Sequence, residues 1–171
     1  MAAITQAFAR KLDATRWGAA IYAAFIAGIV YLVLQSLTTA LIQGYSAWLP
    51  LRMIAAIALG ISVLPETGAS LEVIFTAFLI HFGLSIMTAW ILAPLIEGVP
   101  LAKALLIGAV LGLVIYLVNY YLLTAVFTWF GGIRGWSTLI DHLIFGAVMA
   151  WSYQRRRLRP AFIRPSMPHS P

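Results

Sequence analysis

The chain contains no cysteine and very little charge. The absence of cysteine excludes disulfide bonds, metal sites built on thiolates and cysteine nucleophiles. Charged residues make up 9% of the 171 residues, whereas about 25% is usual in a soluble domain. Hydrophobic residues make up 63%, and the mean hydropathy is +0.96. This composition excludes an ordinary soluble domain and predicts a protein that lies within a membrane.

Catalytic motifs are also missing. Neither H-E-x-x-H nor G-x-S-x-G occurs, so nothing in the sequence indicates a zinc protease or a serine hydrolase. We therefore expect no enzymatic activity, no catalytic residue, and no bound metal or cofactor.

The chain does have long, continuous apolar runs. At about 1.5 Å per residue, residues 71–96 would form a helix of roughly 39 Å, enough to cross a hydrocarbon core of about 30 Å. Such runs are not typical of a membrane β-barrel, whose strands alternate over about 10 residues. The sequence predicts an all-α, polytopic membrane protein, with a four-transmembrane-helix bundle at residues 17–153. The predicted spans are residues 17–43, 71–96, 101–129 and 136–153.

A shorter apolar piece, residues 51–64, lies between the first two spans. Pro50 precedes it and Pro65 follows it, which suits a helix that starts at one proline and stops at the other. Apolar pieces of about 10 to 14 residues are more often interfacial or re-entrant than spanning. We therefore expect a half-helix that lies on the membrane or re-enters it.

The two ends of the chain are polar and basic. Residues 1–16 place apolar side chains at four-residue spacing among basic ones, as in an amphipathic helix on a cytoplasmic membrane surface. A cleaved signal peptide would also begin with basic residues, but its apolar stretch is usually only about 7 to 15 residues, and no clear A-x-A site follows. Residues 154–171 are rich in arginine and proline, and we expect a disordered tail.

Most basic residues fall on one side of the predicted membrane. With the N-terminus in the cytoplasm, all of the 11 lysines and arginines except Arg52 and Arg134 lie on the cytoplasmic side. The positive-inside rule therefore predicts a multi-pass inner-membrane protein with both termini in the cytoplasm. The net charge of +6 indicates contact with anionic headgroups of the bilayer rather than with nucleic acid. The residues expected to make this contact are Arg155, Arg156, Arg157 and Arg159.

His81 stands near the middle of the second span, where an ionisable side chain needs a polar partner or an aqueous cavity. Ser85 lies one turn along on the same face. The other predicted spans also become polar in the half of the membrane that would face outwards. The residues of this predicted polar cluster are His81, Ser85, Asn119, Tyr120, Asp141 and His142. A cluster of this kind is a candidate ion or proton site.

Other interpretations of the histidines stay open. A neutral His81 bonded to Asn119 or to a tyrosine of the third span would only fix the helix register. Alternatively, His81 and His142 could ligate a haem or a metal in a membrane redox subunit. The sequence offers no fuller ligand set for either group.

Asp141 and His142 are neighbours, so their side chains point about 100° apart on a helix and need different partners. Arg134 or Arg52 could form a salt bridge with Asp141 at the membrane interface. Glycines at four-residue spacing allow close helix contacts. The glycines expected at such contacts are Gly108, Gly112 and Gly146.

Several short features have a familiar combination: Pro-Leu-Arg at residues 50–52, His81 with Phe82, Gly108 with Gly112, and His142 with Gly146. Over residues 17–153 the chain resembles small, uncharacterised four-helix bacterial inner-membrane proteins with a YagU-like layout. Some relatives carry the label sodium:proline symporter, which implies a much larger bundle than four spans provide. The resemblance implies a bacterial membrane and supplies no catalytic residue.

These observations predict an accessory or assembly subunit, or a small permeability protein. Four short helices enclose little volume, so a transport path would need a homo-oligomer or a larger membrane complex.

Overall fold

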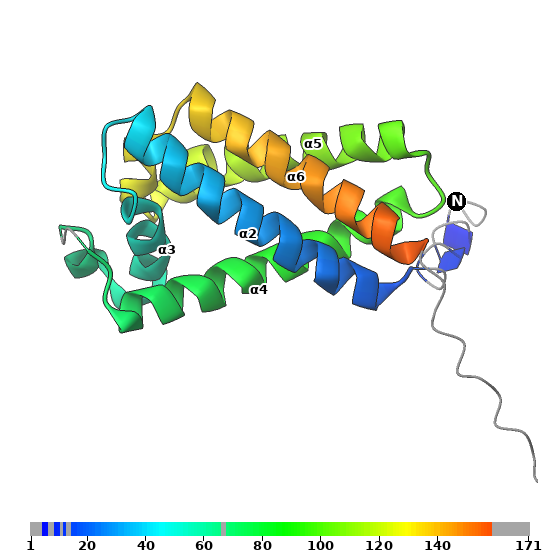
Figure 1. The fold of residues 1–171 in the computed structure, drawn as a ribbon, viewed down its shortest axis with the longest axis horizontal. Helices are drawn as coiled ribbons and strands as arrows, with labels where there is room; N and C mark the ends of the chain where they lie inside the picture. Colours follow the sequence, from blue (N-terminus) through cyan, green and yellow to red (C-terminus); the bar gives the residue numbers. More distant parts are fainter. Residues whose placement is uncertain (1–4, 7–8, 11, 13–14, 66–67, 159–171) are drawn as a thin grey trace, which may run out of the picture.

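The computed structural model describes residues 5–6, 9–10, 12, 15–65 and 68–158. All regular secondary structure in these residues is helical (Figure 1). Three segments are long and apolar enough to cross a membrane: Trp17–Leu41, Leu71–Ile96 and Leu101–Ala125. The chain is therefore an all-α membrane protein. Most of the predicted N-terminal amphipathic segment lies outside the described residues, as does the predicted tail from Arg159 onwards.

The second predicted span is helix α4, Leu71–Ile96, and its bounds match the prediction. The Ser70 side chain caps its start by accepting a hydrogen bond from the backbone N–H of Val73 at 3.3 Å. Beyond its end, Gly98 has a φ of 71°, which glycine adopts without steric strain. Local turn chemistry thus sets both ends of α4.

The third span loses its α-helical geometry before the predicted end. Helix α5 covers Leu101–Leu117 and is followed by the π turn η2 (Val118–Leu122) and the 3₁₀ turns η3 (Leu123–Ala125) and η4 (Thr128–Ile133). The prediction of one helix to residue 129 is therefore wrong. Side chains bind carbonyls of this segment: Arg134 Nη1 donates to Tyr120 O at 3.3 Å, and Thr124 Oγ1 donates to Tyr121 O at 3.0 Å. Side chains that enter the hydrogen-bond ladder in this way distort a helix.

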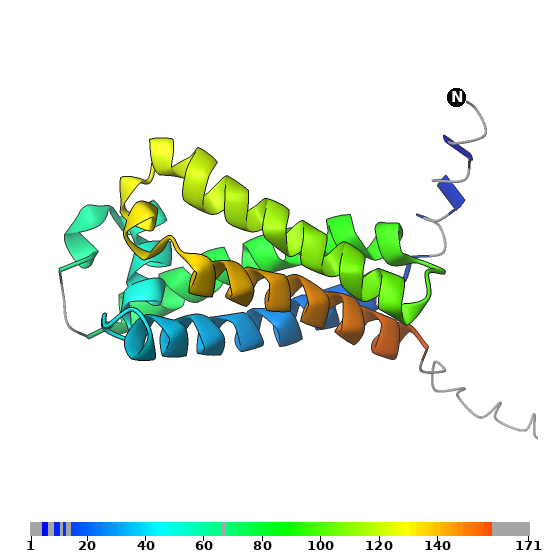
Figure 2. The same cartoon turned by 90° about the horizontal axis from the view of Figure 1, so that it is seen from above.

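Helix α6, Trp136–Arg157, packs against both α5 and α2, the latter covering Trp17–Leu41 (Figures 1 and 2). Helix α4 packs mainly against α2 and α3, and makes far fewer contacts with α5 although the two are consecutive. Helix α3, Leu49–Leu59, lies across the end of the bundle that is far from Trp17, where α2 begins (Figure 1). The bundle is consequently tight around α6 and loose between α4 and α5.

Glycines bring α5 and α6 into backbone contact. A Cβ atom added at Gly108 would lie 2.3 Å from the carbonyl oxygen of Gly146. One added at Gly112 would lie 2.0 Å from the carbonyl oxygen of His142, and one at Gly146 would lie 1.9 Å from that of Gly108. No side chain fits at these three positions, so the glycines fix how closely the two helices pack.

The end of α6 is bonded to the turn between α4 and α5. Glu97 accepts hydrogen bonds from Tyr153 and from Arg157, with which it also forms an ion pair. Gln154 Nε2 donates to the carbonyl oxygens of Ile96 at 2.9 Å and Val99 at 3.1 Å. These bonds, and the favourable placement of arginines in a last helical turn, keep α6 helical through Arg157. The first residues of the predicted tail therefore belong to α6.

Candidate functional site

A cavity of about 390 Å³ lies in the half of the bundle nearer α3. Residues of α2, α3, α4, α5, η2, η3, η4 and α6 line it, and most of them are apolar. All members of the predicted polar cluster except Asp141 contribute to its wall. The fold thus brings the polar side chains of this cluster from α4, η2 and α6 together around one cavity.

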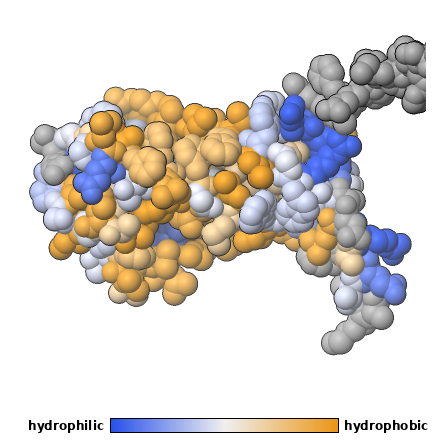
Figure 3. Space-filling model, turned by 90° about the horizontal axis from the view of Figure 1, so that it is seen from below, coloured by the Kyte–Doolittle hydropathy of each residue, from blue (hydrophilic) through white to orange (hydrophobic). Residues whose placement is uncertain are grey.

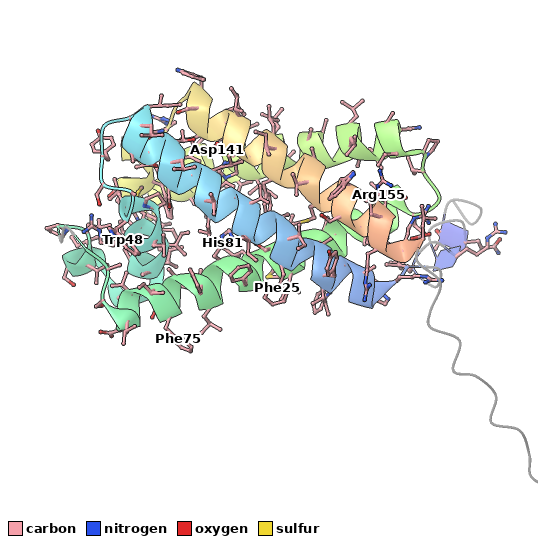
Figure 4. All side chains as sticks on the ribbon, viewed as in Figure 1. Phe25, Trp48, Phe75, His81, Asp141 and Arg155 are labelled. Carbon is pink, nitrogen blue, oxygen red and sulfur yellow. The ribbon has the colours of Figure 1, made fainter. Side chains whose placement is uncertain are left out.

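His81 is buried, with 8% of its surface exposed, and lies in the middle of the bundle (Figure 4). Its Nε2 is 3.0 Å from the carbonyl oxygen of Gly28. A carbonyl can only accept a hydrogen bond, so Nε2 carries the hydrogen and Nδ1 is an acceptor. The ring also stacks on Tyr31, with the centroids 5.6 Å apart. The prediction that His81 bonds to Asn119 or to a tyrosine of the third span is therefore wrong.

His142 is held by two bonds. Its Nδ1 lies 2.8 Å from the carbonyl oxygen of Thr138, and its Nε2 lies 3.2 Å from the hydroxyl of Tyr31. By the same reasoning, Nδ1–H donates to Thr138 and Nε2 accepts from Tyr31. Both nitrogens of His142 are thus engaged within the protein.

Tyr31 connects the two histidines and was missing from the predicted cluster. Its ring stacks on His81 and meets the ring of His142 edge-on at 4.8 Å between centroids. The sequence did contain a signal for Tyr31, because it lies one helical turn before the polar residue Gln35 and therefore on the same helix face. Both residues line the cavity.

Asp141 does not line the cavity and lies in the first half of α6 (Figure 4). It is 4% exposed, and its Oδ1 accepts a hydrogen bond from Thr38 Oγ1 at 3.2 Å. The predicted salt bridge is wrong, because the two arginines bind backbone carbonyls instead: Arg134 binds that of Tyr120, and Arg52 binds that of Gly68. As expected from their angular separation, Asp141 and His142 have different partners.

Ser85 and Asn119 complete the polar wall. Neither side chain forms a hydrogen bond with any residue that the structure describes. Ser85 is 1% exposed, and Asn119 belongs to the π turn η2. Turns of this kind are rare and are often found at functional sites. These side chains and His81 all line the cavity, and together with Nδ1 of His81 they leave hydrogen-bonding capacity in its wall.

A haem or metal does not fit this arrangement. Both nitrogens of His142 are bonded, and the Tyr31 ring contacts both imidazoles. That leaves Nδ1 of His81 as the one imidazole nitrogen here without a protein partner, and a metal site needs several ligands. Within the described part of the chain, no group of three His, Cys, Asp or Glu residues is placed to hold a metal.

The comparisons with other proteins leave the resemblance noted in the sequence as a prediction. No protein-family model, no curated protein and no solved structure matches the chain.

Proposed function

We propose that the chain is a four-span inner-membrane bundle in which α6 is the fourth span. At 22 residues, α6 would be about 33 Å long, enough for a hydrocarbon core of about 30 Å. It packs along α2 and α5 (Figure 2). Its polar residues Ser137, Thr138 and Asp141 are buried, whereas Trp136 and Trp151 are exposed. An apolar outside and a polar inside suit a helix surrounded by lipid.

Both termini would face the cytoplasm, because Arg16, Lys103 and the arginines of the last turn of α6 lie at the end of the bundle where α2 begins and α6 ends. With 11 residues, α3 would be about 17 Å long and too short to cross, so it would be the half-helix at the opposite boundary. Two of the C-terminal arginines lie over aromatic rings: Arg155 over Trp151 and Arg156 over Tyr22. Aromatic and basic residues are both typical of the membrane interface, so these pairs favour placing this end of the bundle among anionic headgroups.

Reporter fusions test this topology. A fusion after Arg134 is expected outside the cytoplasm, and a fusion after Arg157 inside it, because α6 separates the two positions. Alkaline phosphatase and green fluorescent protein activities measure the two locations. Fusions that report the same side at both positions would show that α6 does not span.

The cavity carries the functional proposal: the protein is an accessory subunit that holds a small molecule inside the membrane and catalyses no reaction. A permeability protein needs a path through the bundle. Between the cavity and the end of the bundle where α2 begins and α6 ends, however, packed side chains such as Leu92, Ile96, Met149 and Tyr153 are buried. A closed end favours binding over conduction. A homo-oligomer or a larger complex would be the subunit's partner.

Native mass spectrometry of the protein released from membranes tests this function. The wild-type chain is expected to carry an added mass that His81→Leu loses, because this variant removes a polar group of the cavity wall. Ser152→Ala is the control, since Ser152 is buried but does not line the cavity. A wild-type chain that appears only at the mass of the polypeptide alone would contradict the proposed function.

A further inference from the structure

We infer that the cavity binds an uncharged lipid that has a hydroxyl headgroup and enters sideways from the bilayer between α4 and α5. This inference rests on the proposed function and names the ligand class for the same site.

The opening of the cavity is apolar and faces outwards. Its lining includes Leu84, Met87 and Ile91 of α4, which are 51%, 58% and 56% exposed, and Val114 of α5, which is 48% exposed. These residues belong to the spans Leu71–Ile96 and Leu101–Ala125, so their exposed surface would meet hydrocarbon. Figure 3 shows the middle of one face as largely hydrophobic, with hydrophilic surface gathered toward the ends. The lateral gap between α4 and α5 therefore opens to lipid tails.

The inner wall of the cavity is polar and incompletely bonded. Nδ1 of His81 accepts, the hydroxyl of Ser85 donates and accepts, and the amide of Asn119 does both. None of the three has a hydrogen-bond partner in the described part of the chain. Polar groups in a hydrocarbon environment are costly unless they are bonded. A ligand that both donates and accepts would satisfy this wall, and a hydroxyl group does so with a single atom.

The lining also restricts the charge of the ligand. Among the described residues, no lysine, arginine, aspartate or glutamate lines the cavity, so none of them would neutralise a charged headgroup. The volume of about 390 Å³ falls within the range of small-molecule sites, about 300 to 1,000 Å³. The headgroup and the first part of a chain would fit inside, with the rest of the chain lying between α4 and α5.

Photocrosslinking to the full chain in lipid nanodiscs tests the ligand class. The probe is hexadecanol with a diazirine on its chain, and hexadecyl sulfate with the same diazirine, which stays ionised, is the control. The alcohol is expected to label peptides of α4 and α5 at least about tenfold more than the sulfate, which carries an uncompensated charge. Ser85→Ala and Asn119→Leu should each lower alcohol labelling by roughly 3- to 10-fold. Ser152→Ala, also a buried serine without a described partner, should leave it unchanged.

Competition on the wild-type chain avoids any effect of the substitutions on folding. Unlabelled hexadecanol should displace the alcohol probe, whereas hexadecane should not. Equal labelling by the sulfate and the alcohol, equal competition by hexadecane, or equal labelling of Ser85→Ala, Asn119→Leu and Ser152→Ala would overturn the inference. If a bound mass is present in the native spectrum but the alcohol probe fails, the ligand class is wrong and the proposed function stands.

Discussion

Gly112→Ala is expected to lower the free energy of unfolding by roughly 3 kcal/mol, and the melting temperature by about 6 to 12 °C. The new Cβ would lie 2.0 Å from the carbonyl oxygen of His142 and 2.9 Å from its carbonyl carbon. Both atoms are helix backbone, so α5 and α6 must move apart as whole elements. Loss of this contact also displaces His142 from Tyr31, to which it bonds.

Gly83→Ala is the matched control for this substitution. Gly83 also lies within a span, but a Cβ there would meet no heavy atom within 4 Å. Alanine favours a helix over glycine by about 1 kcal/mol, so Gly83→Ala should leave stability unchanged or raise it slightly. Circular dichroism at 222 nm during heating in one detergent compares the two. Equal melting temperatures for Gly112→Ala and Gly83→Ala would contradict the packing described for α5 and α6.

The sequence predicted best what depends on local chemistry. The bounds of α4 follow from a serine cap and from Gly98, which are both visible in the chain. The angular separation of Asp141 and His142 follows from helix geometry, and the structure gives them different partners. The collection of polar residues at similar depths was also foreseeable, because depth can be counted along each apolar run.

What the sequence could not predict depends on contacts between distant segments. The partner of His81 is a backbone carbonyl, that of Gly28, and every residue offers one, so no side chain marks it. The π turn after Leu117 arises where Arg134 and Thr124 bind carbonyls of the same segment. Tyr31 resembles an ordinary core tyrosine until the fold places it between two histidines.

Ser85→Cys would place a thiol in the cavity wall, and we expect this thiol to react with a reagent that enters the cavity. Its labelling is easy to measure because the chain has no other cysteine. Ser85 lines the cavity, while Ala89, one turn along on the same helix face, lies in the closed core beside Leu92. Both positions are almost fully buried, at 1% and 2% exposure, so they differ mainly in whether they face the cavity. A reagent small enough to enter from the bilayer should distinguish them by at least about tenfold in labelling rate, the ratio that corresponds to about 1.4 kcal/mol.

The central claim is that a polar cavity opens sideways into the membrane, and maleimide labelling of these two variants in intact membranes tests it most directly. We predict that a lipid-soluble maleimide labels Ser85→Cys and not Ala89→Cys, and that a charged, membrane-impermeant maleimide labels neither. Equal labelling of the two variants by the lipid-soluble reagent would show that no such cavity exists, and labelling of Ser85→Cys by the charged reagent would show that it opens to water instead.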